Sequence, residues 1–213
     1  VIGYVPIEEY TFFVVETILA GLWWWFLARR IVLPLTPSPS LRSASQSPSG
    51  RGEFTRNKRL VYLSTCILLS IWLLSAYLFF FGEATWTYLS IILFWALPPI
   101  ILQLLFGADI LWHYRKLVFW AIFVPGTYLS LMDIVALKET TWSISPNQIT
   151  GILFFGILPI EEVLFFFITN VLLTFGMTLL LANVSQERIA EIKKQVQAYP
   201  ERRRGRRARR ALD

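Results

Sequence analysis

Five stretches of this sequence are each long and apolar enough to cross a lipid bilayer. About 20 mostly apolar residues span the hydrocarbon core, where backbone polar groups must be satisfied within the chain, so helices are favoured. Only 16% of the residues are charged, whereas soluble domains average about a quarter. We therefore expect an all-α, polytopic membrane helix bundle. Its five or so transmembrane helices are expected at residues 5–28, 60–81, 86–106, 117–137 and 150–182.

The basic residues concentrate on one side of this expected bundle. Of the 20 Lys and Arg residues, all except Lys138 lie between spans one and two, between spans three and four, or after span five. The positive-inside rule assigns that side to the cytosol. We expect a disordered, Pro- and Ser-rich cytosolic loop at 34–59 and a basic cytosolic tail at 184–213. The tail is expected to attract anionic lipid headgroups, or to link to a further domain, rather than to bind nucleic acid.

A short motif occurs twice in the chain. Residues 6–13 read PIEEYTFF and residues 159–166 read PIEEVLFF, so six of eight positions match at an offset of 153. Four crossings lie within this offset, so both copies should run in the same direction, which indicates a parallel duplication. We expect repeat copies that end in 1–28 and 86–182, within an intact bundle of about seven helices. The chain opens at Val1 without Met, and further helices are expected before it.

The repeated motif places acidic residues inside apolar spans. Glu8, Glu9, Glu161 and Glu162 are expected within the membrane, with Asp133 near the same, exterior side. Carboxyl groups at such depth are costly and usually face a bundle interior or a cavity. Desolvation favours their neutral form, which can donate a proton, while a neighbouring acid can stay ionised and accept one. These five residues are our candidate catalytic groups; the structural alternative is hydrogen bonding between helices.

Aromatic residues accompany the acids. Phe12, Phe13, Phe165, Phe166 and Trp142 are candidate substrate-binding residues. Most phenylalanines in such helices simply pack against lipid or core, and tryptophan suits the membrane interface. In a cavity, however, the ring faces could stabilise a carbocation as they stabilise an ammonium group.

Several chemistries lack the residues they need. The sequence contains no glycine-rich nucleotide motif and no HExxH or cysteine cluster, so no cofactor and no metal is expected. The single Cys66 is expected to be a small buried residue, and His113 to lie in a short cytosolic loop. Two kinds of function remain: acid–base catalysis on an apolar substrate, and ion transport.

Five segments of the second half form a recognisable pattern: Met132–Ala136, Trp142–Pro146, Gly151, Pro159–Glu162 and Phe165–Phe166. This pattern resembles the membrane lycopene cyclase family, which occurs as small prokaryotic subunits and as the first domain of fungal bifunctional lycopene cyclase/phytoene synthases. Two departures are Met132, where the family usually has Trp, and Ser145, where it has Asn. With the first copy of the repeated motif included, the resemblance covers most of residues 1–182.

The resemblance implies a lycopene cyclase-like membrane domain at 1–183, most similar to the fungal cyclase domain, with a fused or associated phytoene synthase. It implies a lycopene beta-cyclase, an intramolecular lyase or isomerase of carotenoid biosynthesis, which converts lycopene through gamma-carotene to beta-carotene without net redox change. Two alternatives stay open: a proton- or cation-coupled transporter that uses the same carboxylates as a relay, and a membrane terpene cyclase for another polyene.

Overall fold

The computed structural model describes residues 7–30, 57–139, 146–190, 192–194 and 197, with side chains except at positions 7–9 and 146. The chain divides into two compact units, one of residues 1–33 and 55–179 and one of 34–54 and 180–213. The first unit holds nearly all of the described helices. The expected disordered loop at 34–59 and most of the basic tail lie outside the described residues.

Five long helices make up the first unit, in agreement with the all-α prediction. All five are long and apolar enough to cross a membrane, because 22 to 27 residues at about 1.5 Å each exceed the core thickness of about 30 Å. Many large apolar side chains are exposed on them, as lipid-facing surfaces require. The helices are α1 (Ile7–Arg30), α2 (Lys58–Phe81), α3 (Thr87–His113), α4 (Arg115–Lys138) and α5 (Ile160–Leu181).

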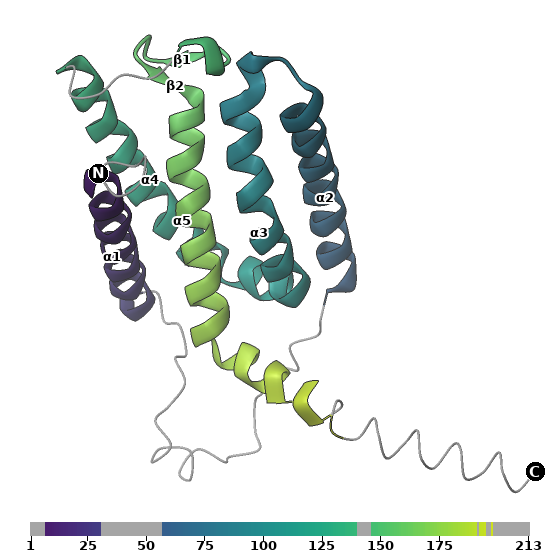
Figure 1. The fold of residues 1–213 in the computed structure, drawn as a ribbon. Coiled ribbons are helices and arrows are strands. Elements are labelled where there is room, and N and C mark those ends of the chain that lie inside the picture. The colour runs from purple at the N-terminus through teal and green to yellow at the C-terminus, as the bar shows by residue number, and fades with distance from the viewer. Residues whose placement is uncertain (1–6, 31–56, 140–145, 191, 195–196, 198–213) are drawn as a thin grey trace, which may run out of the picture. The chain divides into compact units, whose positions relative to one another are not determined.

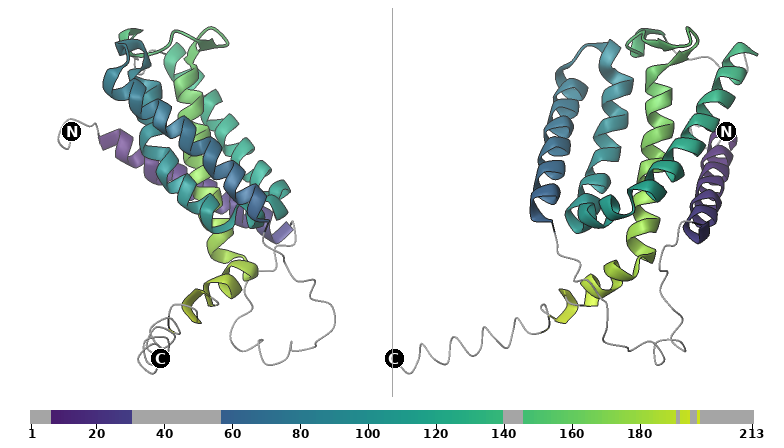
Figure 2. Two further views of the ribbon diagram at one scale, coloured as in Figure 1. Left: turned by 90° about the vertical axis from the view of Figure 1, so that its right-hand side faces the viewer. Right: turned by 180° about the vertical axis from the view of Figure 1, so that it is seen from behind.

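The helices associate as two pairs with α5 between them (Figures 1 and 2). In one pair α2 packs along α3, where the Trp72 ring stacks on Phe94 and its Nε1–H donates to the Phe94 carbonyl at 3.0 Å. In the other pair α1 packs along α4, where Trp23 Nε1–H donates to the Trp120 carbonyl at 3.0 Å. A tryptophan N–H thus joins the two helices of each pair, and between α2 and α3 the tryptophan ring stacks across as well.

Two small residues let helices approach closely. Gly107 interrupts α3 with a φ of −159°, and a Cβ there would lie 2.6 Å from Leu179 Cδ2. On α4 a Cβ at Gly126 would lie 3.2 Å from the Phe167 ring. Both contacts are with α5, so these glycines set how near α3 and α4 come to the central helix.

The last expected span is wrong at its start. Hydropathy predicted one helix over 150–182, but α5 begins at Ile160, and β1 (Leu153–Phe154) pairs antiparallel with β2 (Leu158–Pro159) before it. The hairpin turns through Phe155 and Gly156, which have φ values of 51° and 70°, as tight primed turns require. Pro159, the last residue of β2, directly precedes the first residue of α5.

Two smaller expectations are also corrected. His113 is the last residue of α3 rather than part of a loop, and only Tyr114 separates it from α4. Cys66 is exposed on α2, not buried. In the second unit, Gln186 Nε2–H donates to the Leu180 carbonyl at 2.7 Å, so the chain immediately after α5 keeps local hydrogen bonds.

Candidate active site

The site begins at the N-terminus of α5, which the hairpin holds in place. The Ile160 N–H donates to the Ile152 carbonyl at 3.0 Å, so the first residue of α5 is bonded to the hairpin. β2 packs against α4. Glu161 and Glu162 follow in the first helical turn, where the helix dipole favours negative charge. They therefore lie at the start of α5, not three turns into a longer helix as the predicted span implied.

Glu161 is completely buried, with 0% of its surface exposed. Its Oε1 accepts two hydrogen bonds from Thr150, at 2.7 Å from the backbone N–H and at 2.6 Å from the hydroxyl. Its Oε2 is also buried and has no hydrogen-bond partner among the residues described. Buried polar atoms are nearly always hydrogen-bonded. This unpaired oxygen is therefore a candidate contact point for a reacting group.

Glu162 and Asp133 extend the acidic cluster. The Tyr88 hydroxyl of α3 donates to Glu162 Oε1 at 2.7 Å and lies within electrostatic range of Asp133 and Glu161. Asp133 of α4 is buried, with 4% of its surface exposed. Side chains from α3, α4 and α5 therefore meet at one end of the bundle, and three of the candidate residues, Asp133, Glu161 and Glu162, lie there.

A second polar contact joins α1 to α5 further along the helices. Glu16 is buried, and its Oε1 accepts from the Thr169 hydroxyl at 2.7 Å and, more weakly, from Asn170 Nδ2 at 3.5 Å. Trp24 Nε1–H donates to the Thr178 hydroxyl at 2.9 Å. These partners are 153 or 154 positions apart, so α1 and α5 run in the same direction in a constant register.

The four predicted phenylalanines contact one another between the same two helices. Phe12 lies 5.9 Å from Phe166 and Phe13 lies 5.9 Å from Phe165, measured between ring centroids, and all four rings meet edge to face or nearly so. Such aromatic pairs add about 0.5–1.5 kcal/mol each. The observed contacts of these rings are with each other, which favours a role in packing α1 against α5 over a role in substrate binding.

Three predicted site residues cannot be placed. Glu8 and Glu9 belong to α1, but their side chains lie outside the described residues, and so does Trp142. Whether the first acidic pair reaches the cluster around Glu161 therefore stays a prediction.

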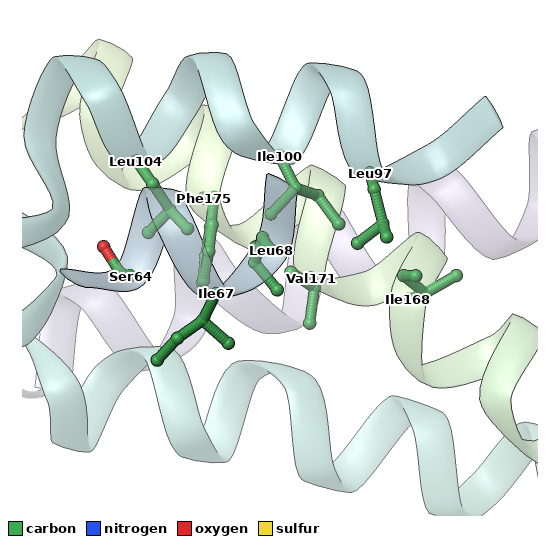
Figure 3. A pocket seen from close by; sticks show the side chains of 9 residues that line it. All are labelled: Ser64, Ile67, Leu68, Leu97, Ile100, Leu104, Ile168, Val171 and Phe175. Atoms are coloured by element: carbon green, nitrogen blue, oxygen red, sulfur yellow. The ribbon is translucent and has the colours of Figure 1, made fainter. Parts of the chain in front are cut away.

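An apolar pocket of about 410 Å³ lies between α2, α3 and α5 (Figure 3). Each of the three helices contributes three side chains to its lining, all of them apolar except Ser64. The residues from α5 are Ile168, Val171 and Phe175. A volume of this size lies in the range of small-molecule sites.

Sequence reasoning missed two members of the site. Tyr88 looks like an ordinary interfacial tyrosine, and its role depends on α3 meeting α5, which no local pattern reports. Thr150 was included in an apolar span, although Gly151 directly after it, with φ of 77°, was a signal that the helix starts later. Among the described residues, no three His, Cys, Asp or Glu side chains gather as metal ligands would.

Five helices long and apolar enough to cross a membrane, with buried carboxyl groups among them, are the features of a multi-pass membrane protein. Lycopene beta-cyclase of Halobacterium salinarum is 35% identical over 176 residues, which are 82% of this chain and 64% of that protein. The bifunctional lycopene cyclase/phytoene synthase of Podospora anserina is 34% identical over 178 residues, which are 81% of this chain and 28% of that protein. The corresponding protein of Phaffia rhodozyma is 30% identical over 185 residues, 82% of this chain and 25% of that protein.

Over this matched region the chain is homologous to lycopene beta-cyclase and to the cyclase region of the fungal bifunctional proteins. The chain spans less than two thirds of the length of these relatives. No protein-family model and no solved structure matches it.

Proposed function

We propose that the chain is the cyclase part of a lycopene beta-cyclase, which closes the linear ends of lycopene to β rings by way of gamma-carotene. The observation that carries the proposal is Glu161, a fully buried acid with one oxygen fixed by two donors and the other unpaired among the described residues. The family relationship supports the same reaction, because its members at 30–35% identity are named for it.

The reaction needs a proton donor, an apolar binding site and a proton acceptor. An acid adds its proton to the terminal double bond, the new C–C bond forms as the neighbouring double bond attacks the cation, and a base removes a ring proton. The proton count is unchanged, and no electron carrier is used. Positioned acids and bases each contribute about 10²–10⁴-fold.

The geometry favours a division of labour between the two acids of α5. In the protonated form Glu161 can present its proton on Oε2, because Oε1 is occupied by the Thr150 donors. Glu162 accepts from the Tyr88 hydroxyl, which stabilises its carboxylate form and suits a base. Asp133 completes the cluster, and Glu8 and Glu9 are proposed to serve the same site from α1.

The test is ring formation in lycopene-producing cells that express the complete protein. The wild-type protein should convert lycopene to cyclised pigment, and Glu161→Gln should lower the product at least about 10²-fold at equal membrane level. Glu83→Gln, which changes an exposed acid in the α2–α3 turn, serves as the control and should keep full conversion. Unchanged lycopene from correctly inserted wild-type protein would refute the proposal.

A proton-coupled transporter is the second candidate, and one observation favours it. Buried acids occur at several depths, because Glu16 lies midway along α1 and Asp109 lies near the opposite end of α3 from Tyr88, and such a series suits a relay. A transporter would show flux driven by a pH gradient in liposomes and would leave lycopene unchanged. Pigment conversion without such flux would eliminate it.

A further inference from the structure

The apolar pocket and the buried acid share one face of α5. Glu161, Ile168 and Phe175 are seven residues apart in turn, and Val171 lies three after Ile168. Residues spaced by three, four and seven lie along one stripe of a helix. By helix rise, Ile168 is about 10 Å and Phe175 about 21 Å from Glu161 along the axis. The pocket is thus in line with the acid, not elsewhere around the helix.

The chemistry of the pocket restricts what it can hold. Eight of its nine lining side chains are hydrocarbon or aromatic. The exception is Ser64, whose hydroxyl donates to the Leu60 carbonyl of its own helix at 2.8 Å. A charged or strongly polar ligand would therefore lose its hydrogen bonds to water without replacement. An extended hydrocarbon chain makes no such hydrogen bonds and would lose none.

We propose that the α2–α3–α5 pocket binds the isoprenoid chain of the polyene substrate, aligned along α5 so that its reacting end reaches Glu161. This inference rests on the proposed function and adds to it where the unreactive part of the substrate lies. Binding of that remote part fixes the reacting double bond against the acid, which is how positioning lowers a barrier.

Substitutions that fill the pocket test the proposal first. Ile100→Trp on α3 and Val171→Trp on α5 replace lining residues, and each should reduce cyclised product at least tenfold in lycopene-producing cells at normal membrane protein level. Leu102→Trp is the matched control, because Leu102 lies on the same helix and is 66% exposed, and it should stay within twofold of wild type. Full activity of both pocket variants would overturn the proposal.

A binding measurement keeps the test independent of catalysis and of how well tryptophan variants fold. Ser64→Cys is a nearly isosteric change, made in a Cys66→Ser background. Alkylation of this cysteine by a membrane-permeant maleimide should slow at least fivefold in liposomes that contain lycopene, relative to liposomes of phospholipid alone. The wild-type protein is the control: its single cysteine, Cys66, is exposed two residues away and should react at the same rate in both kinds of liposome.

The two failures can be told apart. If lycopene slows alkylation at position 64 but the wild-type protein forms no ring, the pocket stands and the proposed cyclase reaction falls. If the wild-type protein forms rings but lycopene leaves the rate at position 64 unchanged, the pocket proposal falls and the cyclase reaction stands.

Discussion

The hydrogen bond between Glu16 and Thr169 predicts an asymmetric response to mutation. In Thr169→Val the buried Glu16 keeps, among the residues that the structure describes, only Asn170 Nδ2 at 3.5 Å, which is longer than an effective N–H···O bond. In Glu16→Leu the Thr169 hydroxyl can still bond its own helix, where the Phe165 and Phe166 carbonyls lie 3.0 Å away. Only the first change leaves a buried group without a good partner.

The magnitude follows from this difference. An unsatisfied buried acceptor costs about 1–3 kcal/mol, whereas hydrogen bonds between membrane helices average about 0.6 kcal/mol and reach about 1.7. Thr169→Val should therefore lower the free energy of unfolding by about 1–2 kcal/mol in the wild-type background. In the Glu16→Leu background the same change should cost less than about 0.5 kcal/mol.

The assay is a double-mutant cycle on purified protein in lipid–detergent micelles, unfolded with increasing SDS. Thr17→Val is the control, since the Thr17 hydroxyl is exposed and donates to the Phe13 carbonyl of its own helix at 2.8 Å. This substitution should change stability little. An equal cost of Thr169→Val in both backgrounds, within about 0.5 kcal/mol, would contradict the assigned contact.

Three further predictions test other parts of the structure. Tyr88→Phe removes the hydroxyl that donates to a carboxylate at 2.7 Å, and cyclised product should fall about 10- to 100-fold at equal protein level; unchanged product would exclude a role in the site. Gly107→Ala places a methyl group 2.6 Å from a leucine side chain and should cost about 1–3 kcal/mol, seen as a lower thermal midpoint. Gly21→Ala, whose nearest contact would be 3.8 Å, should be neutral or stabilising, and equal effects of the two would contradict the close packing. In a cysteine-free background, Glu83→Cys should react with an impermeant thiol reagent from the exterior and Lys116→Cys from the cytosol, and the reverse pattern would refute the orientation derived from the positive charges.

Much of the fold could be predicted because length and apolarity determine membrane helices. The four helices before the hairpin were each expected within a few residues at most ends, although α3 continues to His113. The start of α5 was missed, because hydropathy averages over the apolar run Ile152–Leu158 and does not distinguish an apolar hairpin from a helix. The breakers Gly151 and Gly156, both with positive φ, carried that information.

The candidate site was only partly predictable. Acids in apolar segments are conspicuous in a sequence, so Asp133, Glu161 and Glu162 could be singled out. Their partners are ordinary residues from distant segments: Tyr88 is 74 positions from Glu162. Glu16 and Thr169 are 153 positions apart, the offset of the repeated motif, but their contact depends on how α1 and α5 pack.

The donors for Glu161 come from outside its own helix. Thr150 lies just before the hairpin, and the Ile152–Ile160 hydrogen bond closes that hairpin onto α5. An added residue at the solvent-facing tip, Phe155–Gly156, would leave the strand pairing intact, whereas a one-residue slip of β1 along β2 would carry Thr150 away from the carboxylate. Changes in the segment 150–159 could therefore alter the hydrogen bonds that hold this carboxyl group during evolution while every membrane-crossing segment stayed the same.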